Sequence, residues 1–309
     1  MHVILGAGGA IANALTKELI AKGEKVRLVS RRPITTFAEV QWIQADLTQL
    51  NEVLTAAKGA SVLYLCAGLP YNTKVWAAQW PLIMNHLVEA GITTGARLIF
   101  FDNVYMYGRV HGPMTEETPY NPCSKKGEIR ARIAEQLISA SRAGTVKATI
   151  ARAADFYGAE SLNSFFDSMV IQKYARGQKA MWLGNLNSRH SYTYVPDAGK
   201  ALYLLGQQPD TINEIYHVPT ASALTGREFM ELAAQPFHRK PSYSSVNKFM
   251  LQLAGLFNPV IRETVEMYYQ YRYDYAFDSS KFEQKFGVQP TPYDQGIKTF
   301  SSFFNAKTE

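Results

Sequence analysis

The first half of the chain alternates short apolar runs with longer stretches in which apolar residues recur every three or four positions. The short runs have the length of strands, and the longer stretches have the periodicity of amphipathic helices. Regular alternation of the two is typical of right-handed βαβ units and a doubly wound parallel sheet. The pattern predicts strands at 2–6, 25–30, 41–44, 61–66, 97–102 and 146–152, and helices at 10–22, 48–57, 74–91 and 125–142.

The second half has a less regular pattern. We predict a Rossmann domain at 1–155 and a smaller α/β substrate-binding lobe at 156–309 that is interwoven with it. The partly alternating tyrosines of 267–275 predict an extended segment with one aromatic face. The pattern predicts helices at 162–176, 196–207, 225–235, 246–256 and 259–268, and strands at 180–182, 190–194 and 215–218.

A glycine-rich turn connects the first predicted strand to the first helix. Gly6, Gly9 and Ala12 are spaced three apart, and Gly8 lies inside the turn. Glycine lets a backbone approach a phosphate closely, and the helix that starts at Ala10 and Ile11 offers its N-terminus to an anion. Strand, glycine turn and helix in this order predict a dinucleotide site.

The residues after the second strand bear on the choice of cofactor. Arg31 and Arg32 come directly after this strand, and residues 29–33 include no acidic side chain. A carboxylate here would bind the ribose 2′-hydroxyl of NAD, whereas arginine suits the 2′-phosphate of NADP. We therefore expect NADP(H) in preference to NAD(H).

Two further strand ends complete the predicted cofactor site. Asp46 and Leu47 follow the third strand, where a side chain can reach the adenine amino group. Cys66, Ala67 and Gly68 follow the fourth, where small residues leave room for the cofactor.

Composition indicates an ordinary globular protein. Of 309 residues, 47% are hydrophobic and 19% charged, and the net charge is +6. The basic residues are dispersed, which argues against nucleic-acid binding. We expect no secretion signal, membrane span or metal site, and the two cysteines, Cys66 and Cys123, favour a reducing cytoplasmic setting.

Nine segments along the chain, in a fixed order and spacing, carry a family resemblance. They are LGAGGAIA (5–12), ADL (45–47), YLCAG (64–68), VYMYG (104–108), TEETPYNP (115–122), ARAADFYG (151–158), SYTYVPDAGKAL (191–202), IYHVP (215–219) and FDSSKFEQKFG (277–287). With these segments the chain resembles, across nearly its whole length, the extended short-chain dehydrogenase/reductase family of the epimerase/dehydratase type. The resemblance implies a Rossmann fold, a substrate cleft shaped by the C-terminal lobe, and nicotinamide chemistry. It also places Ala153 and Phe156 beside the cofactor.

The family's Y-x-x-x-K motif is altered in this sequence. Lys126 stands where the tyrosine is expected and Arg130 where the lysine is expected, while Asn103 replaces the upstream serine or threonine. The chain thus resembles atypical members of the family. Arg130 can hold the ribose hydroxyls, Asn103 can polarise a carbonyl, and Lys126 can act as a general acid if its pKa is lowered. The structural alternative for Lys126 is an exposed helix lysine.

Tyr105 is a second candidate for the missing acid, because it lies two residues after Asn103 on the same face of an extended chain. The alternative is an aromatic side chain packed beneath the cleft. His190 lies in the segment that usually lines the family's substrate cleft, although a lone histidine is more often structural.

Two functions follow from these residues. The first is an NADP(H)-dependent oxidoreductase or epimerase-like enzyme with a changed active centre, acting on a small-molecule substrate. The second is a catalytically silent NADP(H)-binding sensor or regulatory protein. By analogy with the family, the helices at 74–91 and 125–142 could form a homodimer. Trp76, Trp80, Ile83 and Leu87 fall on one helical face, which is consistent with either core or dimer packing.

Overall fold

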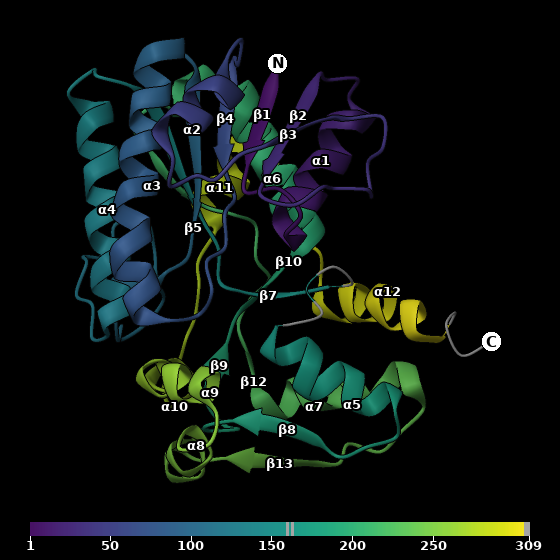
Figure 1. Cartoon of the computed structure of the whole chain (residues 1–309). Helices are drawn as coiled ribbons and strands as arrows, with labels where there is room; N and C mark the ends of the chain where they lie inside the picture. The colour runs from purple at the N-terminus through teal and green to yellow at the C-terminus, as the bar shows by residue number, and fades with distance from the viewer. Residues whose placement is uncertain (159–160, 162–163, 306–309) are drawn as a thin grey trace. The chain divides into compact units, whose positions relative to one another are not determined.

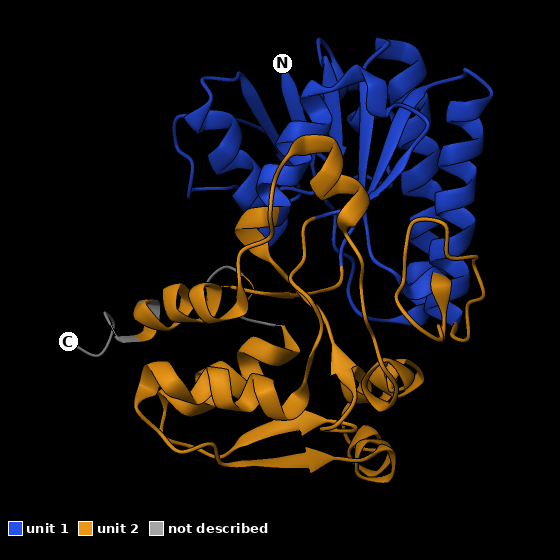
Figure 2. Ribbon diagram, turned by 180° about the vertical axis from the view of Figure 1, so that it is seen from behind, with its two compact units in different colours: residues 1–106, 125–153, 198–218 blue, residues 107–124, 154–197, 219–309 orange. Residues whose placement is uncertain are grey.

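The computed structural model describes residues 1–158, 161 and 164–305. It divides into two compact units, drawn in different colours in Figure 2. Unit 1 consists of 1–106, 125–153 and 198–218, and unit 2 of 107–124, 154–197 and 219–309. The chain therefore contributes three separate segments to each unit.

Unit 1 is built on a seven-stranded sheet in which every neighbouring pair of strands is parallel. The strand order is β11-β6-β5-β4-β1-β2-β3, so the direction of winding reverses between β1 and β4. Ligands of such sheets bind at this switch point, outside the carboxyl ends of the strands. The strands are β1 (His2–Leu5), β2 (Val26–Ser30), β3 (Gln41–Gln44), β4 (Val62–Leu65), β5 (Arg97–Asp102), β6 (Lys147–Arg152) and β11 (Ile215–His217).

Helices cover both faces of this sheet (Figure 1). On one face α2 packs against α3 and α3 against α4; on the other, α6 lies against α1, where Gly199 allows close approach to the backbone of Ala14. The predicted doubly wound sheet is confirmed. The helices are α1 (Ala10–Ala21), α2 (Leu50–Ala57), α3 (Thr73–Thr94), α4 (Lys125–Arg142) and α6 (Val195–Gln207), of which the last begins in unit 2.

Unit 2 combines short two-stranded sheets with short helices. The pairs are β7 (Asp155–Tyr157) with β10 (Tyr192–Tyr194), β8 (Ala180–Leu183) with β13 (Tyr243–Val246), and β9 (Arg189–His190) with β12 (Leu224–Thr225). The helices are α5 (Gln172–Ala175), which continues a π-helical turn at Asp167–Ile171, α7 (Gly226–Ala234), α8 (Lys248–Gly255), α9 (Pro259–Thr264), α10 (Tyr269–Arg272), α11 (Ser280–Phe286) and α12 (Tyr293–Asn305).

The core of unit 2 is rich in aromatic side chains. Phe166, Trp182, Tyr192 and Phe229 are all buried, and their rings meet at centroid distances between 4.9 and 6.4 Å. These contacts supply apolar burial and favourable ring geometry together. The cluster explains why this half of the chain holds together with little regular secondary structure.

Two predictions for the second half need correction or qualification. The extended segment predicted at 267–275 is wrong over its first part, since a 3-10 turn at Val265–Met267 leads into α10. Tyr268 and Tyr271 are three apart and both pack against the cluster that contains Leu183, which favours a helical turn over alternation. Residues 162 and 163 of the predicted helix at 162–176 lie outside the described residues.

Candidate functional site

The glycine turn after β1 lies at the switch point of the sheet. Gly6 has φ +85° and Gly8 has φ +98°, which are backbone conformations that residues other than glycine rarely adopt. The N–H groups of Gly6 and Ala7 both donate to the carbonyl of Val29, at 3.0 and 2.9 Å. A Cβ at Gly6 would stand 2.4 Å from the Cα of Ala67. Glycine is therefore required for the turn to pass against the segment after β4.

The N-terminus of α1 is open to a ligand. Gly9 is the N-cap residue and supplies no side-chain cap, and the first turn contains no acidic residue. A Cβ at Gly9 would meet no atom within 4 Å. The first N–H groups of the helix and the positive end of its dipole are thus available to an anion such as pyrophosphate.

A cavity of about 500 Å³ surrounds this turn. Of the predicted cofactor residues, it is lined by Gly6, Gly8, Gly9, Arg31, Arg32, Asp46, Leu47, Ala67 and Gly68.

Six other predicted cofactor residues do not line this cavity, and one of them, Arg130, is described below. Ala10 and Ile11 form the first turn of α1, and Ile11 is buried. Cys66 directly precedes the lining residues; burial raises the pKa of its thiol to about 12, so the group stays neutral. Ala153 is fully buried at the end of β6, and Phe156 belongs to unit 2.

The cavity also has lining residues that the sequence did not suggest. Gln79 and Ile83 are four residues apart on α3, so they share a face of that helix. The same spacing was visible in the sequence, but nothing there showed which face meets the cofactor. The others are Ala7, Ser30, Ile34, Ala45, Thr48 and Leu69.

The end of β2 presents two exposed arginines to the cavity, Arg31 and Arg32. The loop is held by Ser30, whose hydroxyl donates to the carbonyl of Arg32 at 2.6 Å and accepts from the Trp42 ring N–H at 2.9 Å. Asp46 is the acidic side chain among the lining residues. Hydrogen bonds from Thr48 lower the pKa of Asp46, and the nearby Arg31 charge contributes, so Asp46 is ionised at neutral pH.

The residues after β5 form a compact turn. The backbone N–H of Asn103 donates to the Asp102 carboxylate at 2.8 Å, and the Asn103 side-chain oxygen accepts from the Tyr105 N–H at 3.0 Å. The Tyr105 ring stacks on Trp76 with centroids 6.2 Å apart and an interplanar angle of 12°. Both predicted residues, Asn103 and Tyr105, are therefore fixed in place by α3 and by the turn itself.

Arg130 takes part in a buried ion pair. Its Nε donates to Asp102 at 2.7 Å and a second guanidinium nitrogen also contacts that carboxylate, while Arg152 lies 3.7 Å from the other oxygen. The guanidinium of Arg130 also lies over the rings of Trp80 and Phe100, at 4.4 and 5.0 Å from their centroids. These contacts neutralise Arg130 and tie α4 to β5.

Lys126 lies one turn before Arg130 on α4 and is fully buried. Its ammonium donates to the Thr73 hydroxyl at 2.9 Å and lies 4.6 Å from the centroid of the Tyr71 ring. The interpretation of Lys126 as an exposed helix lysine is therefore wrong. Lys126 and Arg130 lie one turn apart on the same side of α4 but have different partners: Lys126 contacts residues just before and at the start of α3, and Arg130 pairs with Asp102 of β5.

His190 is also buried, in unit 2. Its Nε2 lies 3.1 Å from the Asp155 carboxylate, to which the Tyr271 hydroxyl donates at 2.8 Å. The imidazole is stacked between Tyr271 and Tyr275, with ring centroids 4.9 and 4.4 Å away. The two tyrosine rings fix the orientation of the imidazole, and its Nε2 contacts the Asp155 carboxylate. His190 and Tyr271 together therefore fix the position of that carboxylate.

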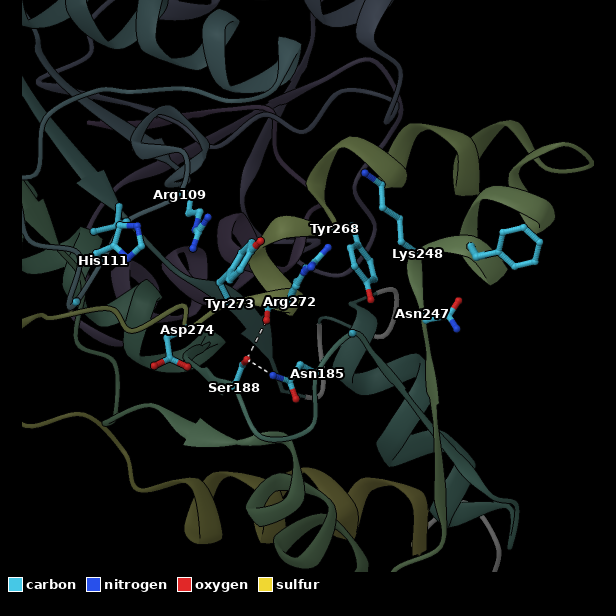
Figure 3. A pocket seen from close by; sticks show the side chains of 14 residues that line it. Arg109, His111, Asn185, Ser188, Asn247, Lys248, Tyr268, Arg272, Tyr273 and Asp274 are labelled. Carbon is cyan, nitrogen blue, oxygen red and sulfur yellow. Dashed lines mark hydrogen bonds between the residues drawn. The ribbon is translucent and has the colours of Figure 1, made fainter.

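Unit 2 contains a larger cavity, of about 870 Å³, shown in Figure 3. Three basic side chains, Arg109, Lys248 and Arg272, line it together with one acidic residue, Asp274. The Arg109 guanidinium lies 3.7 Å from the centroid of Tyr273. The cavity therefore favours an anionic ligand.

Comparison with known proteins agrees with this geometry. Residues 2–218 match the family described as the NAD dependent epimerase/dehydratase family. The chain belongs to that family. None of the curated proteins with which the sequence was compared is similar enough to match it.

Solved structures show the same fold at low sequence identity. MoeE5, in complex with UDP-glucose and NAD, has a TM-score of 0.81 at 21% identity and covers 100% of this chain and 99% of its own. The UDP-glucose 4-epimerase of Thermus thermophilus, with NAD, has 0.80 at 17%, covering 99% of both chains. The dTDP-glucose 4,6-dehydratase of Bacillus anthracis, with NAD, has 0.83 at 14%, covering 99% and 97%.

Two searches of the described residues were negative. No helix in that part of the chain combines the length and apolar character that crossing a bilayer demands. Those residues also include no cluster of three or more histidine, cysteine or acidic side chains suited to a metal ion.

Proposed function

We propose that the chain binds NADP(H) in the cavity around the glycine turn. The observation that carries the proposal is the pair of exposed arginines, Arg31 and Arg32, at the end of β2, where an NAD-specific protein would present a carboxylate. The similar structures named above carry NAD, so the preference for the 2′-phosphate rests on this chain's own residues. Guanidinium groups bind phosphate through bidentate, charge-assisted hydrogen bonds.

The Arg31→Ala variant tests this preference. We expect wild-type protein to bind NADPH more tightly than NADH, and the variant to lose about tenfold in NADPH affinity, in line with about 1.5 kcal/mol for a hydrogen bond to a charged group. NADH affinity stays unchanged. Isothermal titration calorimetry measures both.

Arg132→Ala is the matched control, because Arg132 is an exposed arginine on α4 away from the cavity. An equal affinity of the wild type for NADPH and NADH, or an equal loss in both variants, would overturn the preference for NADP(H).

For the reaction, we propose an oxidoreductase or epimerase-like activity with a changed proton donor. In this proposal the Tyr105 hydroxyl stands in for the family tyrosine and the Asn103 amide polarises the reacting oxygen. The bound nicotinamide supplies or accepts the hydride. Asp102 and Arg130 position this centre, because Asp102 accepts the Asn103 N–H and Arg130 neutralises Asp102. A small molecule is the expected substrate.

A second candidate is a silent NADP(H)-binding sensor or regulatory protein. This candidate is favoured by the two residues at the positions of the family's tyrosine and lysine. Lys126 is fully buried and Arg130 is paired with Asp102, so both side chains are already engaged within the protein. The two candidates differ in turnover. Tested with a panel of carbonyl compounds and nucleotide sugars, a reductase oxidises NADPH as it reduces its substrate, and an epimerase isomerises its substrate with no net change in the cofactor. The silent protein binds the cofactor and converts no substrate.

The α3 side chains at 76, 80, 83 and 87 are all buried in the core of the single chain, so they do not support a dimer. A homodimer through α3 and α4 and a cytoplasmic location both remain predictions. The two cysteines, Cys66 and Cys123, are both free thiols, which is consistent with a reducing compartment.

A further inference from the structure

Exposed apolar side chains are concentrated in one short segment of unit 2. Among the described residues, nine large hydrophobic side chains are exposed, and six of these lie within 249–260. Phe257 is 86% exposed and Leu256 and Phe249 are each 72% exposed. Single exposed hydrophobic residues need no explanation, but a contiguous group marks an interaction surface. The docking face consists of Phe249, Met250, Leu253, Leu256, Phe257 and Val260.

These side chains are carried by a well-formed helical hairpin. Asn247 caps α8 by accepting the Met250 N–H, and Asn258 caps α9 by accepting the N–H groups of Val260 and Ile261. Gly255 lets the two helices pack closely, since a Cβ there would stand 3.0 Å from the Cα of Arg262. Figure 1 shows α8 and α9 together beside β8.

The inner face of the hairpin is already occupied. Leu251 is buried in a cluster with Leu183 and Tyr268, and Ile261 and Val265 pack against that cluster. The exposed apolar face is therefore not the side by which the hairpin packs on the core of unit 2. The hairpin has two apolar faces: the inner one packs on that core, and the outer one is exposed.

The surroundings of the docking face carry a net positive charge. The hairpin itself has two exposed basic residues, Lys248 and Arg262, and one acidic residue, the partly buried Glu263 of α9. Lys248 and Phe249 also line the larger cavity, to which Arg109 and Arg272 contribute two further positive charges. Asp274, the acidic residue of that cavity, accepts a hydrogen bond from the Arg189 backbone.

We propose that the α8–α9 hairpin docks this protein onto the surface of a bilayer that contains anionic phospholipids. Exposed aromatic and leucine side chains beside lysine and arginine are the combination that enters the boundary between headgroups and acyl chains. The apolar side chains enter that boundary, and Lys248 and Arg262 contact the headgroups.

A second copy of the chain fits this face less well. In a twofold interface the same net positive patch meets itself, and the hairpin offers one acidic side chain, the partly buried Glu263, to its two cations. A bilayer with anionic headgroups supplies the opposite charge.

Co-sedimentation of the full chain with vesicles tests the proposal. The comparison uses vesicles of phosphatidylcholine alone and vesicles of phosphatidylcholine mixed with phosphatidylserine. We expect binding to the mixed vesicles to be stronger and to weaken as salt is added, because salt screens surface charge. The double substitution Leu256→Ser with Phe257→Ser should reduce that binding at least about tenfold, since apolar contact is lost.

The controls separate the docking face from general hydrophobicity and charge. Leu82→Ser with Ile92→Ser removes two exposed apolar side chains of α3 and should leave binding unchanged. Lys248→Gln and Arg262→Gln should each weaken binding to mixed vesicles about fivefold, whereas the exposed Lys58→Gln should not.

Three results would overturn the proposal. They are failure to sediment with mixed vesicles, equal sedimentation with both kinds of vesicle, and equal losses in the α8–α9 and α3 variants. Light scattering measures the mass of the protein in solution and so tests whether a second copy occupies the face. If the wild type is a dimer and the double substitution Leu256→Ser with Phe257→Ser makes it a monomer, the face binds a second copy and the proposal is wrong. Circular dichroism confirms that each variant is folded.

Discussion

The residue that organises the proposed active centre is Asp102, at the end of β5. It accepts hydrogen bonds from the Asn103 backbone and from Arg130, and Arg152 lies close to its second oxygen. All three side chains that carry charge here are buried. An ion pair of this kind is costly to break from one side, because the remaining charge stays buried without its counter-ion.

Asp102→Asn should therefore destabilise the protein by about 3–5 kcal/mol. Urea denaturation followed by circular dichroism measures the free energy of unfolding. Glu39→Gln, at an exposed position, is the control and should change stability little. Replacing both partners, as Asp102→Leu with Arg130→Met, should recover part of the loss. A marginal effect of Asp102→Asn would contradict the assigned role of the pair.

At the scale of elements, the π-helical turn before α5 contains a buried carboxyl group, Asp167. The Ser161 hydroxyl donates to it, and its own backbone N–H donates to the Ser164 hydroxyl at 3.1 Å. Burial raises the pKa of Asp167 to about 8, because desolvation disfavours the charged form. The group is thus largely protonated in the folded protein at neutral pH.

This raised pKa makes stability depend on pH in a definite direction. The folded state holds a proton that the unfolded carboxyl, with its ordinary pKa of 3.8, has released. The contribution is fully present below the unfolded pKa and is lost as pH rises through about 8, with a slope of up to about 1.4 kcal/mol per pH unit.

Asp167→Asn should flatten this decline, so that the variant is relatively more stable at alkaline than at acidic pH. Thermal unfolding at a series of pH values measures the difference. Glu39→Gln should keep the wild-type profile. A wild-type profile in Asp167→Asn would show that Asp167 is ionised in the folded state.

At the scale of the whole molecule, the sequence predicted unit 1 far better than unit 2. Four of its seven strands, β1, β3, β4 and β5, are each followed by a helix of the same unit, so local periodicity carries much of the information; the helix predicted at 125–142 is α4. In unit 2, β13 pairs with β8 across a long stretch of chain, and each strand has four residues. Such short strands are defined by their distant partners, and β7, β12 and β13 were missed for this reason.

Two helices near the end of the chain, α11 and α12, were not predicted, for different reasons. In α12, Tyr293, Ile297 and Phe300 are buried at helical spacing, a pattern already visible in the sequence. The shorter α11 has one buried hydrophobic residue, Phe282, which gives no periodicity to detect.

The candidate site divides in a similar way. The glycine turn and the arginines after β2 were found because a local motif specifies them. The sequence placed Arg130 on α4 but could not reveal its partner, because Asp102 lies 28 residues earlier and meets Arg130 only in the folded sheet. The burial of Lys126 likewise depends on Tyr71 and Thr73, just before and at the start of α3.

The most direct test of the central claim is titration of Gly9→Ala with NADPH. A Cβ at Gly9 meets no protein atom within 4 Å and projects beside the helix N-terminus, so the variant should fold with a loss of about 1 kcal/mol or less. We expect the wild type to bind NADPH and the folded variant to lose this binding, because the methyl group occupies the approach of the pyrophosphate. Equally tight binding of NADPH by the variant would contradict the assignment of this cavity as the cofactor site.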